Sequence, residues 1–293
     1  GYEFYESGGM GERGNCKYKG IFKDGMYDGI GEQYDVNGNL IYCGEFENGL
    51  KSGHGCLYNE DRDIIYNGEF NYDKKQGFGN EFNDLQNLIY TGDFLNGKRH
   101  GHGTENYVND TEYLLINYRG MFKEGLYDGW GTEYVNIIDE YSNVTTHLRF
   151  EGEYSNGLRH GLGQYNYING KCEYIGNYLE GQKTGFGVEF HDSELVSRDN
   201  SITFVGSYSN GLRDGLGAEY PLNGNTKYIG IYLNGNRHRC LGNKHIRQSE
   251  RTLSLYVDNV MSQWDNAYAY IYAGVYMRWW NRLPSFRRAR RWM

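Results

Sequence analysis

Aromatic residues and glycines alternate with polar residues along most of this 293-residue chain, in one recurring order. The order is aromatic-x-Gly-x-aromatic-x-x-Gly, then Gly-x-Gly and a further aromatic residue, and its clearest copy runs from Tyr42 to Tyr58. Successive copies lie 24 to 32 residues apart and begin at Tyr18, Tyr42, Tyr66, Tyr90, Tyr118, Phe150, Tyr174, Phe204 and Tyr228. Such a period indicates a repeat architecture, in which each unit buries its apolar face against its neighbours. The chain is therefore predicted to form a platform rather than a pocket.

Each copy predicts a β-hairpin. Its first half alternates at period two, so Tyr42, Gly44 and Phe46 share one face of a strand. An Asn-Gly, Asp-Gly or Glu-Gly step follows in eight of the nine copies, and such steps favour a tight turn. Asp73 replaces the turn glycine of the copy at Tyr66, which predicts an altered turn there. The copy at Tyr228 lacks the Gly-x-Gly pair, which predicts the end of the array.

The Gly-x-Gly pairs also raise the question of a phosphate-binding loop. A dinucleotide-binding loop occurs once, after a strand and before a helix. Here the pair recurs in eight of nine copies and leads into a strand. Glycines inside a strand permit close approach of backbone or rings, and an aromatic side chain can cover them. The pairs are therefore interpreted as structural.

This pattern resembles the MORN (membrane occupation and recognition nexus) repeat, whose consensus is Tyr-x-Gly-x-Phe/Trp-x-x-Gly-x-x-x-Gly-x-Gly. The resemblance covers residues 18–242. It implies an all-β fold, an elongated, twisted, single-layer antiparallel sheet of hairpins that often dimerises end to end. The chain then divides into residues 1–17, a partial repeat or N-terminal cap, residues 18–242 with nine repeats, and residues 243–293, a basic amphipathic C-terminal helix and tail.

Repetition also places charged residues in rows. The position nine residues after the first aromatic residue is basic in seven of nine copies, which predicts a basic rim at the hairpin tips formed by Lys51, Lys75, Arg99, Arg159, Lys183, Arg213 and Arg237. The position fifteen residues after it holds Glu81, Glu105, Glu133, Glu189 and Glu219. By strand alternation these glutamates are expected on the face opposite Phe82, Tyr134, Phe190 and Tyr220. The sheet is thus predicted to have an aromatic face, an acidic face and a basic rim.

The aromatic face is the predicted partner-binding surface. A single-layer sheet leaves such a face partly open, and contiguous exposed apolar surface usually has a partner. The residues assigned to it are Tyr42, Phe46, Tyr66, Phe70, Phe78, Phe82, Tyr90, Phe94, Tyr118, Phe122, Trp130, Tyr134, Tyr174, Tyr178, Phe186 and Phe190. Two interpretations of the rim stay open: its charges solubilise the sheet and blunt its edges, or they steer a partner's helix or peptide into the aromatic groove.

No catalytic site, metal site or cofactor is predicted. His100, His160 and His238 share a repeat position but lie in the fourth, sixth and ninth copies, too far apart to share an ion. His100 and His102 supply two ligands, fewer than a typical zinc site uses. No nucleophile–base pair is recognisable. The longer connections at 107–117, 135–149 and 191–203 are interpreted as insertions on one edge, either solvated loops or sites of binding variation.

Charge divides the chain into two unlike parts. Residues 1–242 carry 21 Lys and Arg against 35 Asp and Glu, whereas residues 243–293 carry 9 against 3. The repeats are therefore poor candidates for binding nucleic acid or anionic lipid, and no nucleic-acid partner is expected. The five cysteines form no C-x-x-C pair and no signal peptide is visible, so a cytoplasmic location, associated with the cytoskeleton or a membrane, is expected. Because the chain opens on Gly1 in mid-repeat, the native protein is expected to extend upstream.

From Arg251 the apolar residues adopt helical spacing. Steps of three or four residues connect Leu253, Val257, Val260, Trp264, Ala267, Ile271 and Val275. The apolar run is too short to be a convincing transmembrane helix. Three interpretations stay open. The helix folds back to fill the aromatic groove or cap the last sheet edge, it lies in a membrane interface with Arg287, Arg288, Arg290 and Arg291 on anionic headgroups, or it pairs with a partner helix or is disordered.

These features predict a non-enzymatic scaffold that binds partner proteins, and the resemblance implies that it can form a homodimer. The resemblance implies a cytoskeletal, ciliary or membrane-associated structure as its place of action. Two alternatives remain. By resemblance, the chain is the regulatory module of a larger signalling enzyme of the lipid kinase or lysine methyltransferase type. In the second alternative it is a phospholipid-binding tether that makes weak anionic membrane contact through its basic tail.

Overall fold

The structure of the protein, a computed structural model, describes residues 1–6, 13–108, 114–139, 141, 143–192, 202–220, 228–241, 251, 255, 259 and 262. These residues belong to two compact units. The first comprises Gly1–His160 with Ile168–Gly170, and the second comprises Gly161–Tyr167 with the described residues from Lys171 onward. The division falls within β13 (Leu158–Asn166).

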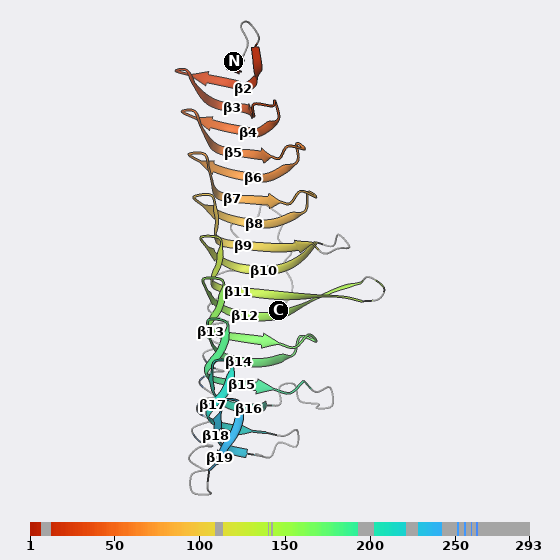
Figure 1. The fold of residues 1–293 in the computed structure, drawn as a ribbon, viewed down its shortest axis with the longest axis vertical. Helices are drawn as coiled ribbons and strands as arrows, with labels where there is room; N and C mark the ends of the chain where they lie inside the picture. The colour runs from red at the N-terminus through yellow and green to blue at the C-terminus, as the bar shows by residue number, and fades with distance from the viewer. Residues whose placement is uncertain are drawn as a thin grey trace, which may run out of the picture. The chain divides into compact units, whose positions relative to one another are not determined.

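The first unit is an open antiparallel sheet in which each strand pairs with the next strand along the chain (Figure 1). Its strands before β13 are β1 (Tyr2–Glu6), β2 (Arg13–Lys23), β3 (Met26–Tyr34), β4 (Leu40–Glu47), β5 (Leu50–Tyr58), β6 (Ile64–Asn71), β7 (Lys74–Phe82), β8 (Leu88–Leu95), β9 (Lys98–Val108), β10 (Leu114–Lys123), β11 (Leu126–Ile138) and β12 (Val144–Ser155).

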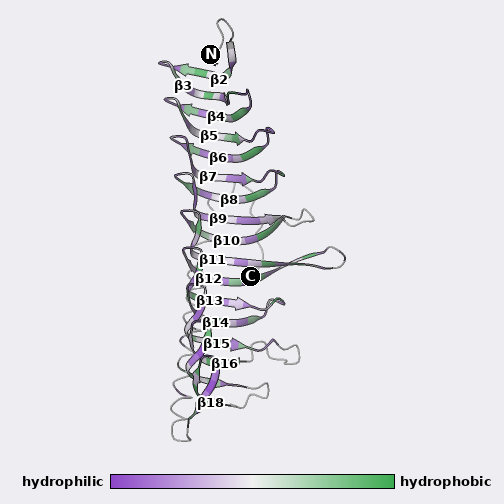
Figure 2. Ribbon diagram, viewed as in Figure 1, coloured by the Kyte–Doolittle hydropathy of each residue, from purple (hydrophilic) through white to green (hydrophobic). Residues whose placement is uncertain are grey.

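The second unit follows the same rule of antiparallel pairing in chain order. Its strands after β13 are β14 (Cys172–Leu179), β15 (Gln182–Phe190), β16 (Ile202–Ser209), β17 (Leu212–Glu219), β18 (Tyr228–Leu233) and β19 (Asn236–Cys240). All nine repeats found in the sequence form hairpins, and the copy at Tyr228 supplies the short pair β18 and β19. Hydrophilic and hydrophobic residues are interspersed along the strands, as two-faced strands require (Figure 2).

Two-residue turns join the two strands of each repeat. Asn48 and Gly49 both have positive φ angles, 51° and 86°, which is the type I′ geometry that matches the right-handed twist of a hairpin. Tyr72 and Asp73 have φ angles of 48° and 64°. The altered turn expected at Asp73 is therefore wrong, because this copy keeps the two-residue turn with two non-glycine residues in the left-handed region.

Replacement of Tyr72 by Asn should stabilise this turn. A β-carbon in the left-handed region costs about 1 kcal/mol, and Asn tolerates that region better than Tyr does. Because Tyr72 is 73% exposed, its ring contributes little packing. We expect Tyr72→Asn to raise the free energy of unfolding by up to about 1 kcal/mol in urea titrations. Leu85→Asn, an equally exposed site without a positive φ angle, should change it by less than about 0.5 kcal/mol.

The core consists of aromatic rings that lie over glycines on one face of each sheet. In the copy at Tyr66, the paired residues Gly68 and Gly79 leave room for the Tyr66 ring, whose exposed fraction is 0%. A β-carbon on Gly79 would lie 2.3 Å from Tyr66 Oη. The Tyr66 hydroxyl donates a hydrogen bond to the backbone oxygen of Glu69, at 3.0 Å. The predicted close approach of a ring is confirmed for Gly79, the second glycine of its pair, whereas the first, Gly77, has a φ angle of 63° and lies against Glu69.

Neighbouring repeats are connected through these rings. The Tyr66 ring meets the edges of two phenylalanines, Phe70 of its own copy and Phe94 of the next, both at a centroid distance of 5.2 Å. Such T-shaped pairs are a favourable aromatic geometry. The same arrangement recurs at Tyr42 and Tyr90. Each copy therefore completes its core with a ring from the next.

The connection at 135–149 extends a hairpin rather than forming a loop. Val135 pairs with His147 and Ile137 pairs with Thr145, so β11 and β12 continue to a turn near Tyr141. The interpretation of this segment as a solvated loop is wrong, because its residues satisfy one another's backbone hydrogen bonds. In the connection at 107–117, Leu115 pairs with Tyr107. Residues 193–201 lie outside the described residues.

Most of the C-terminal stripe and Arg287, Arg288, Arg290 and Arg291 also lie outside the described residues. Arg251, Leu255, Asn259 and Ser262 are described, have helical backbone and are exposed. Within the part of the chain that the structure describes, no helix has the length and apolar character needed to cross a membrane.

Candidate functional site

The face that carries the first aromatic residue of each copy is here called the tyrosine face. Cross-strand partners in an antiparallel sheet project to the same side. Tyr66 pairs with Glu81, and Tyr174 pairs with Glu189, so these glutamates lie on the tyrosine face. The prediction of a separate acidic face is therefore wrong.

The basic residues predicted to form a rim at the hairpin tips lie over the aromatic rings instead. Arg99 lies 4.5 Å from the centre of the Tyr90 ring, and Lys183 Nζ lies 4.3 Å from that of Tyr174. All seven basic residues make this contact with the first aromatic ring of their own copy, at 4.1 to 5.3 Å. A cation in this position is attracted by the ring's negative face.

Cations and glutamates alternate along the tyrosine face in a ladder of ion pairs. In the first unit Glu81 accepts hydrogen bonds from Lys75 at 2.7 Å and from Arg99 at 2.8 Å. Arg99 also donates a hydrogen bond to Glu105 at 2.9 Å. Arg159 also pairs with Glu133. Each glutamate that bonds two cations therefore ties its own repeat to the next.

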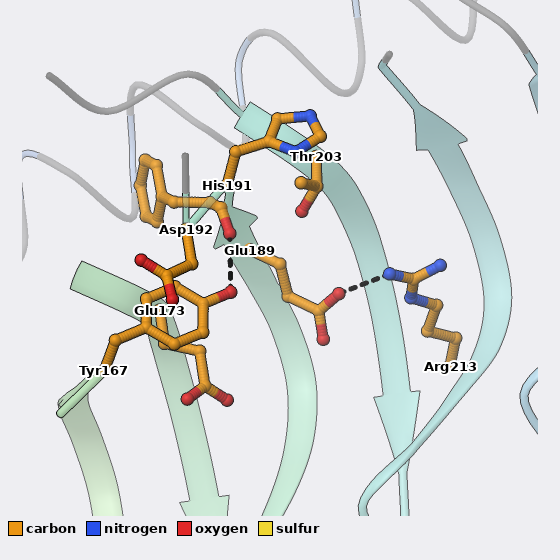
Figure 3. Close-up of a pocket in the computed structure, with 8 residues that line it drawn as sticks. Tyr167, Glu173, Glu189, His191, Asp192, Thr203 and Arg213 are labelled. Atoms are coloured by element: carbon orange, nitrogen blue, oxygen red, sulfur yellow. Dashed lines mark hydrogen bonds and ion pairs between the residues drawn. The ribbon is translucent and has the colours of Figure 1, made fainter. Parts of the chain in front are cut away.

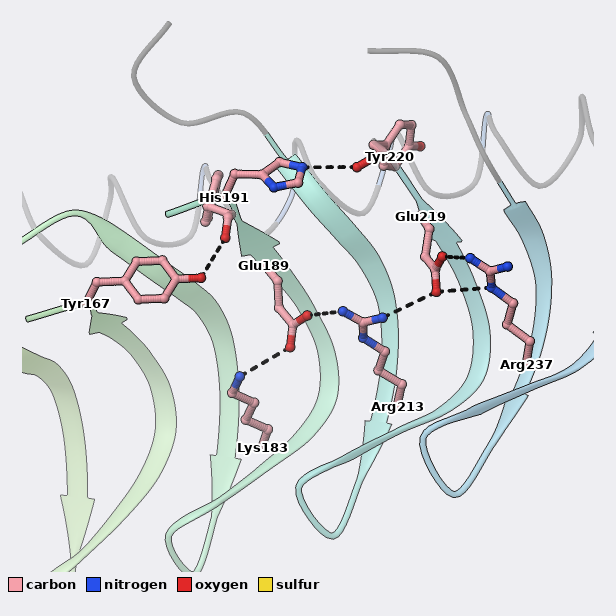
Figure 4. Close-up of polar contacts among 9 residues, drawn as sticks. Tyr167, Lys183, Glu189, His191, Arg213, Glu219, Tyr220 and Arg237 are labelled. Atoms are coloured by element: carbon pink, nitrogen blue, oxygen red, sulfur yellow. Dashed lines mark hydrogen bonds and ion pairs between the residues drawn. The ribbon is translucent and has the colours of Figure 1, made fainter. Parts of the chain in front are cut away.

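The second unit repeats the ladder over three hairpins (Figure 4). Glu189 pairs with Lys183 of its own copy at 3.3 Å and with Arg213 of the next. Glu219 pairs in the same way with Arg213 at 3.4 Å and with Arg237. Side chains of this part of the ladder are 19% to 28% exposed except Arg237, which is 42% exposed. The ladder thus lies between the buried rings and solvent.

Tyrosines occupy the cation position in the two copies that lack a basic residue. Tyr27 stacks on Tyr18, and Tyr127 stacks on Tyr118, in both cases with ring centroids 3.7 Å apart. The Tyr27 hydroxyl donates to Glu3 at 2.6 Å, and the Tyr127 hydroxyl donates to Glu105. Sequence reasoning missed both residues, although their position, nine residues after the first aromatic, was visible. In eight of the nine copies, all but that of Lys51, this position thus holds a side chain that covers a ring and bonds a carboxylate among the described residues.

Lys51 interrupts the ladder. The glutamate position of its copy holds Leu57, and that of the preceding copy holds Gln33. Among the described residues Lys51 forms no side-chain ion pair, although Nζ lies 5.3 Å from the centre of the Tyr42 ring. Burial lowers the pKa of the Lys51 ammonium, and the charge of Asp73 opposes that shift. Gln33 Oε1 is buried and has no hydrogen-bond partner in the part of the chain that the structure describes. Within the described ranges, this part of the tyrosine face therefore contains a cation that forms no ion pair.

Six of the residues assigned to the aromatic face lie on the other side of the sheet, here called the reverse face. Phe78 pairs with Asp93, Trp130 with Glu153 and Phe186 with Ser207, all next to residues of the tyrosine face. Phe82, Tyr134 and Phe190 directly follow Glu81, Glu133 and Glu189 and therefore alternate to the reverse face. The assignment of these six residues is corrected by the register.

The other ten assigned residues share the tyrosine face as expected, but they are not exposed. Tyr42, Tyr66, Tyr90, Tyr118 and Tyr174 are each 0% exposed, and the aromatics four residues later are 2% to 5% exposed. The expectation of an open aromatic groove is therefore wrong. Rings, ladder cations and glutamates cover one another, and the surface offered to solvent is the ladder.

The ladder shifts the pKa values of its glutamates. Burial alone would raise the pKa of Glu81, but the hydrogen bonds and charges of Lys75 and Arg99 outweigh burial and hold that pKa below its usual value. The pKa of Glu189 is lowered against the same effect of burial by Lys183 and Arg213. A lowered folded-state pKa stabilises the fold above the unfolded-state pKa of about 4.3.

Acid should therefore weaken the ladder. As the pH falls from about 4.3 through the lower folded-state pKa values, the stability contributed by these glutamates is lost. We expect Glu81→Gln to lower the free energy of unfolding by about 2 kcal/mol at pH 7, because Lys75 and Arg99 lose a charged acceptor. In urea titrations the difference from the natural chain should shrink at about pH 3. Glu153→Gln, an exposed residue of the reverse face, serves as the matched control, and an equal loss there would contradict the prediction.

A pocket of about 300 Å³ lies at one side of the ladder in the second unit (Figure 3). Its lining includes Glu189 and Arg213, which already pair with each other, and Tyr167, whose hydroxyl donates to the Phe190 backbone oxygen at 3.0 Å. The His191 ring lies 3.2 Å from the backbone oxygen of Tyr220 and donates to it. These polar groups are engaged in contacts that hold strand ends together. Across the described ranges, no three His, Cys, Asp or Glu side chains are grouped so as to hold a metal ion.

Comparison with protein families agrees with this geometry. Seven segments match the MORN repeat model, at residues 18–40, 42–63, 66–82, 90–112, 150–172, 174–193 and 204–220. The chain belongs to the MORN-repeat proteins. The copies at Tyr118 and Tyr228 are outside the matched segments but form hairpins with the same ring contacts. The search of curated proteins found no match to the chain.

Proposed function

We propose that this protein is a non-enzymatic scaffold whose tyrosine face binds a partner protein at a cytoskeletal, ciliary or membrane-associated structure. MORN repeats indicate a repeat protein of a kind generally involved in membrane and protein interaction. The observation that carries the proposal is the ladder of cations and carboxylates over the tyrosine face. A regular row of both charges can recognise an extended partner along several repeats and fix its register, since complementary charges confer specificity.

The ladder favours a protein partner over a purely anionic one. Most of its cations already bond glutamates, so a polyanion would have to compete with those carboxylates and would meet their charge. A protein segment that carries both charges can bond alternate members without breaking the pairs. Lys51 is the exception, because it has no ion-pair partner among the described residues. Under this proposal Lys51 receives a carboxylate of the partner.

The test is affinity capture of a partner from extracts of the source cells with face-specific variants. The first bait is the full chain. The second carries Lys51→Glu and Arg237→Glu on the tyrosine face. The third carries Lys19→Glu and Arg119→Glu, which make the same charge change on the reverse face. Circular dichroism should confirm that all three baits are folded.

The expected result is at least one protein retained by the full chain and by the reverse-face variant but lost from the tyrosine-face variant. Its binding should then be reproduced with the purified partner and should weaken with salt, as electrostatic recognition does. Retention of the same proteins by all three baits would refute the tyrosine face as the binding site. Loss of binding only from the reverse-face variant would place the site on the other side.

A further inference from the structure

The reverse face carries a continuous central row of side chains, formed by the residues one and fourteen positions after the first aromatic of each copy. In the second unit this row begins with Gln164 and is aliphatic over β14 to β18. Direct cross-strand pairs connect Ile175 to Val188, Val188 to Val205, Val205 to Ala218 and Ala218 to Ile229, over β14 to β18. All five residues are buried, with exposed fractions of 0% to 4%.

Over β4 to β9 of the first unit the same row is polar and open. It contains Cys43 paired with Cys56, Asn67 paired with Asn80, and Thr91 paired with Thr104. These residues are half-buried, or exposed in the case of Asn67. They have the same strand neighbours on both sides as their counterparts in the second unit. Flanking strands alone therefore leave this position partly open, so the burial of Val188 and Ala218 requires a further layer on the reverse face.

The C-terminal segment supplies a matching surface. Arg251, Leu255, Asn259 and Ser262 are exposed and fall within about 80° of one another around a helix of 3.6 residues per turn. On an ideal helix with the same phase, the apolar stripe expected from the sequence, from Leu253 through Val260 to Val275, would fall on the opposite side. The helical spacing therefore assigns the exposed residues to one side and the apolar stripe to the other.

The length of the C-terminal segment also matches the aliphatic row. Five strands spaced about 4.8 Å apart give the aliphatic row a length of about 19 Å. A helix rises about 1.5 Å per residue, so about 13 residues span that distance. Residues 253–275 exceed this length, and their apolar residues can cover an aliphatic row.

We infer that residues 251–275 of the same chain dock on the aliphatic row of the reverse face in the second unit, through the apolar stripe of their helix. This site differs from the aromatic groove and the last sheet edge, the two places considered from the sequence. The docked segment closes the reverse face of β14 to β18 and leaves the tyrosine face free for a partner.

Thiol accessibility tests this docking in the full chain. Cys56 stands at the same repeat position as Ala218, so Ala218→Cys introduces a thiol whose natural counterpart lies on the open part of the row. We expect N-ethylmaleimide, monitored site by site by mass spectrometry, to modify the introduced thiol at least tenfold more slowly than Cys56. Adding Val257→Asp and Val260→Asp should abolish the protection, whereas Leu255→Asp, on the outer side, should preserve it.

Three outcomes would overturn the inference: equal rates at both thiols in the full chain, protection that survives Val257→Asp with Val260→Asp, or protection that falls on dilution and so marks a second copy. The Cys56 rate reports whether the first sheet stays folded. Because the double substitution could unfold the second unit, cross-linking gives an independent reading. A short bifunctional maleimide should join Val188→Cys to one of Val257→Cys, Val260→Cys or Trp264→Cys within one chain. Failure of all three, or equal cross-linking from Leu255→Cys, would also overturn it.

Discussion

Raising the pH above about 10 should unfold each sheet within about one to three pH units, because both cores contain many buried tyrosines. Ten tyrosines are 0% to 4% exposed: Tyr18, Tyr42, Tyr66, Tyr90, Tyr118, Tyr154, Tyr174, Tyr178, Tyr208 and Tyr232. Burial raises the pKa of Tyr66 and Tyr174 well above the usual value, and nearby carboxylates raise both further. Six of the ten belong to the first unit and four to the second.

The direction in which stability changes with pH follows from the number of protons that each state binds. Above about pH 10 an unfolded tyrosine loses its proton, while a buried tyrosine keeps it. The folded state then binds more protons, so stability falls by about 1.4 kcal/mol per tyrosine and pH unit until the raised folded-state pKa is reached. Six tyrosines give a slope of about 8 kcal/mol per pH unit in the first unit. At that slope, an ordinary free energy of unfolding of about 5–15 kcal/mol falls to zero within one or two pH units.

Two signals recorded together test this prediction. Phenolate absorbance and far-ultraviolet circular dichroism should change over the same pH range, because the hydroxyls ionise only when the sheet opens. Tyr66→Phe with Tyr90→Phe should flatten the pH slope, at a cost of about 1 kcal/mol per lost hydrogen bond at pH 7. Phe204 already lies over Gly206 and Gly217 in its own copy, so the ring fits without a hydroxyl. Ionisation near pH 10 with the sheet intact would contradict the prediction.

The hairpins and their turns could be predicted from the sequence because they depend on local residues. Asn-Gly steps supply two positive φ angles, and period-two alternation fixes which residues of one strand share a face. The nine-copy array follows from the same local signals. The hairpin fold can therefore be predicted without knowing which residues distant in sequence are in contact.

The faces were misassigned because residues were grouped by type rather than by register. A two-residue turn at Tyr72 and Asp73 pairs even-numbered residues of β6 with odd-numbered residues of β7. Counting outward from the turn therefore places Glu81 with Tyr66 and Phe78 on the other side. The register shift between Gly68 and Phe70 adds two residues and so preserves these sides. This signal was present in the sequence and could have corrected the prediction.

The different environments of the reverse face could not be derived from the repeat alone. Cys56 and Val188 occupy the same position in copies with the same local pattern, yet Cys56 is half-buried and Val188 is 0% exposed. The change from polar to aliphatic residues along this row was visible. Whether these residues are buried depends on contact with a segment distant in sequence. Alternation within one copy cannot predict such a contact.

Substitution of Gly79 by Ala should be among the most destabilising single changes in the first unit. A β-carbon there would lie 2.3 Å from Tyr66 Oη and 2.6 Å from two carbons of the ring. Gly79 lacks a positive φ angle, so the cost comes from this collision and not from backbone strain. The ring cannot move aside without losing its contacts with Phe70 and Phe94. We expect a loss of about 3 kcal/mol in the free energy of unfolding.

A double-mutant cycle identifies the collision as the cause. Tyr66→Ala alone should cost about 3–5 kcal/mol through the cavity it leaves. Adding Gly79→Ala to it should cost little more, because the ring that the β-carbon would strike is gone, so the two losses should be far from additive. Gly97→Ala provides the contrast, since Gly97 has no atom near its β-carbon position but a φ angle of 86°, and should cost about 1 kcal/mol from strain with or without Tyr66. Additive losses for Gly79→Ala and Tyr66→Ala in urea titrations would show that the glycine is required for another reason.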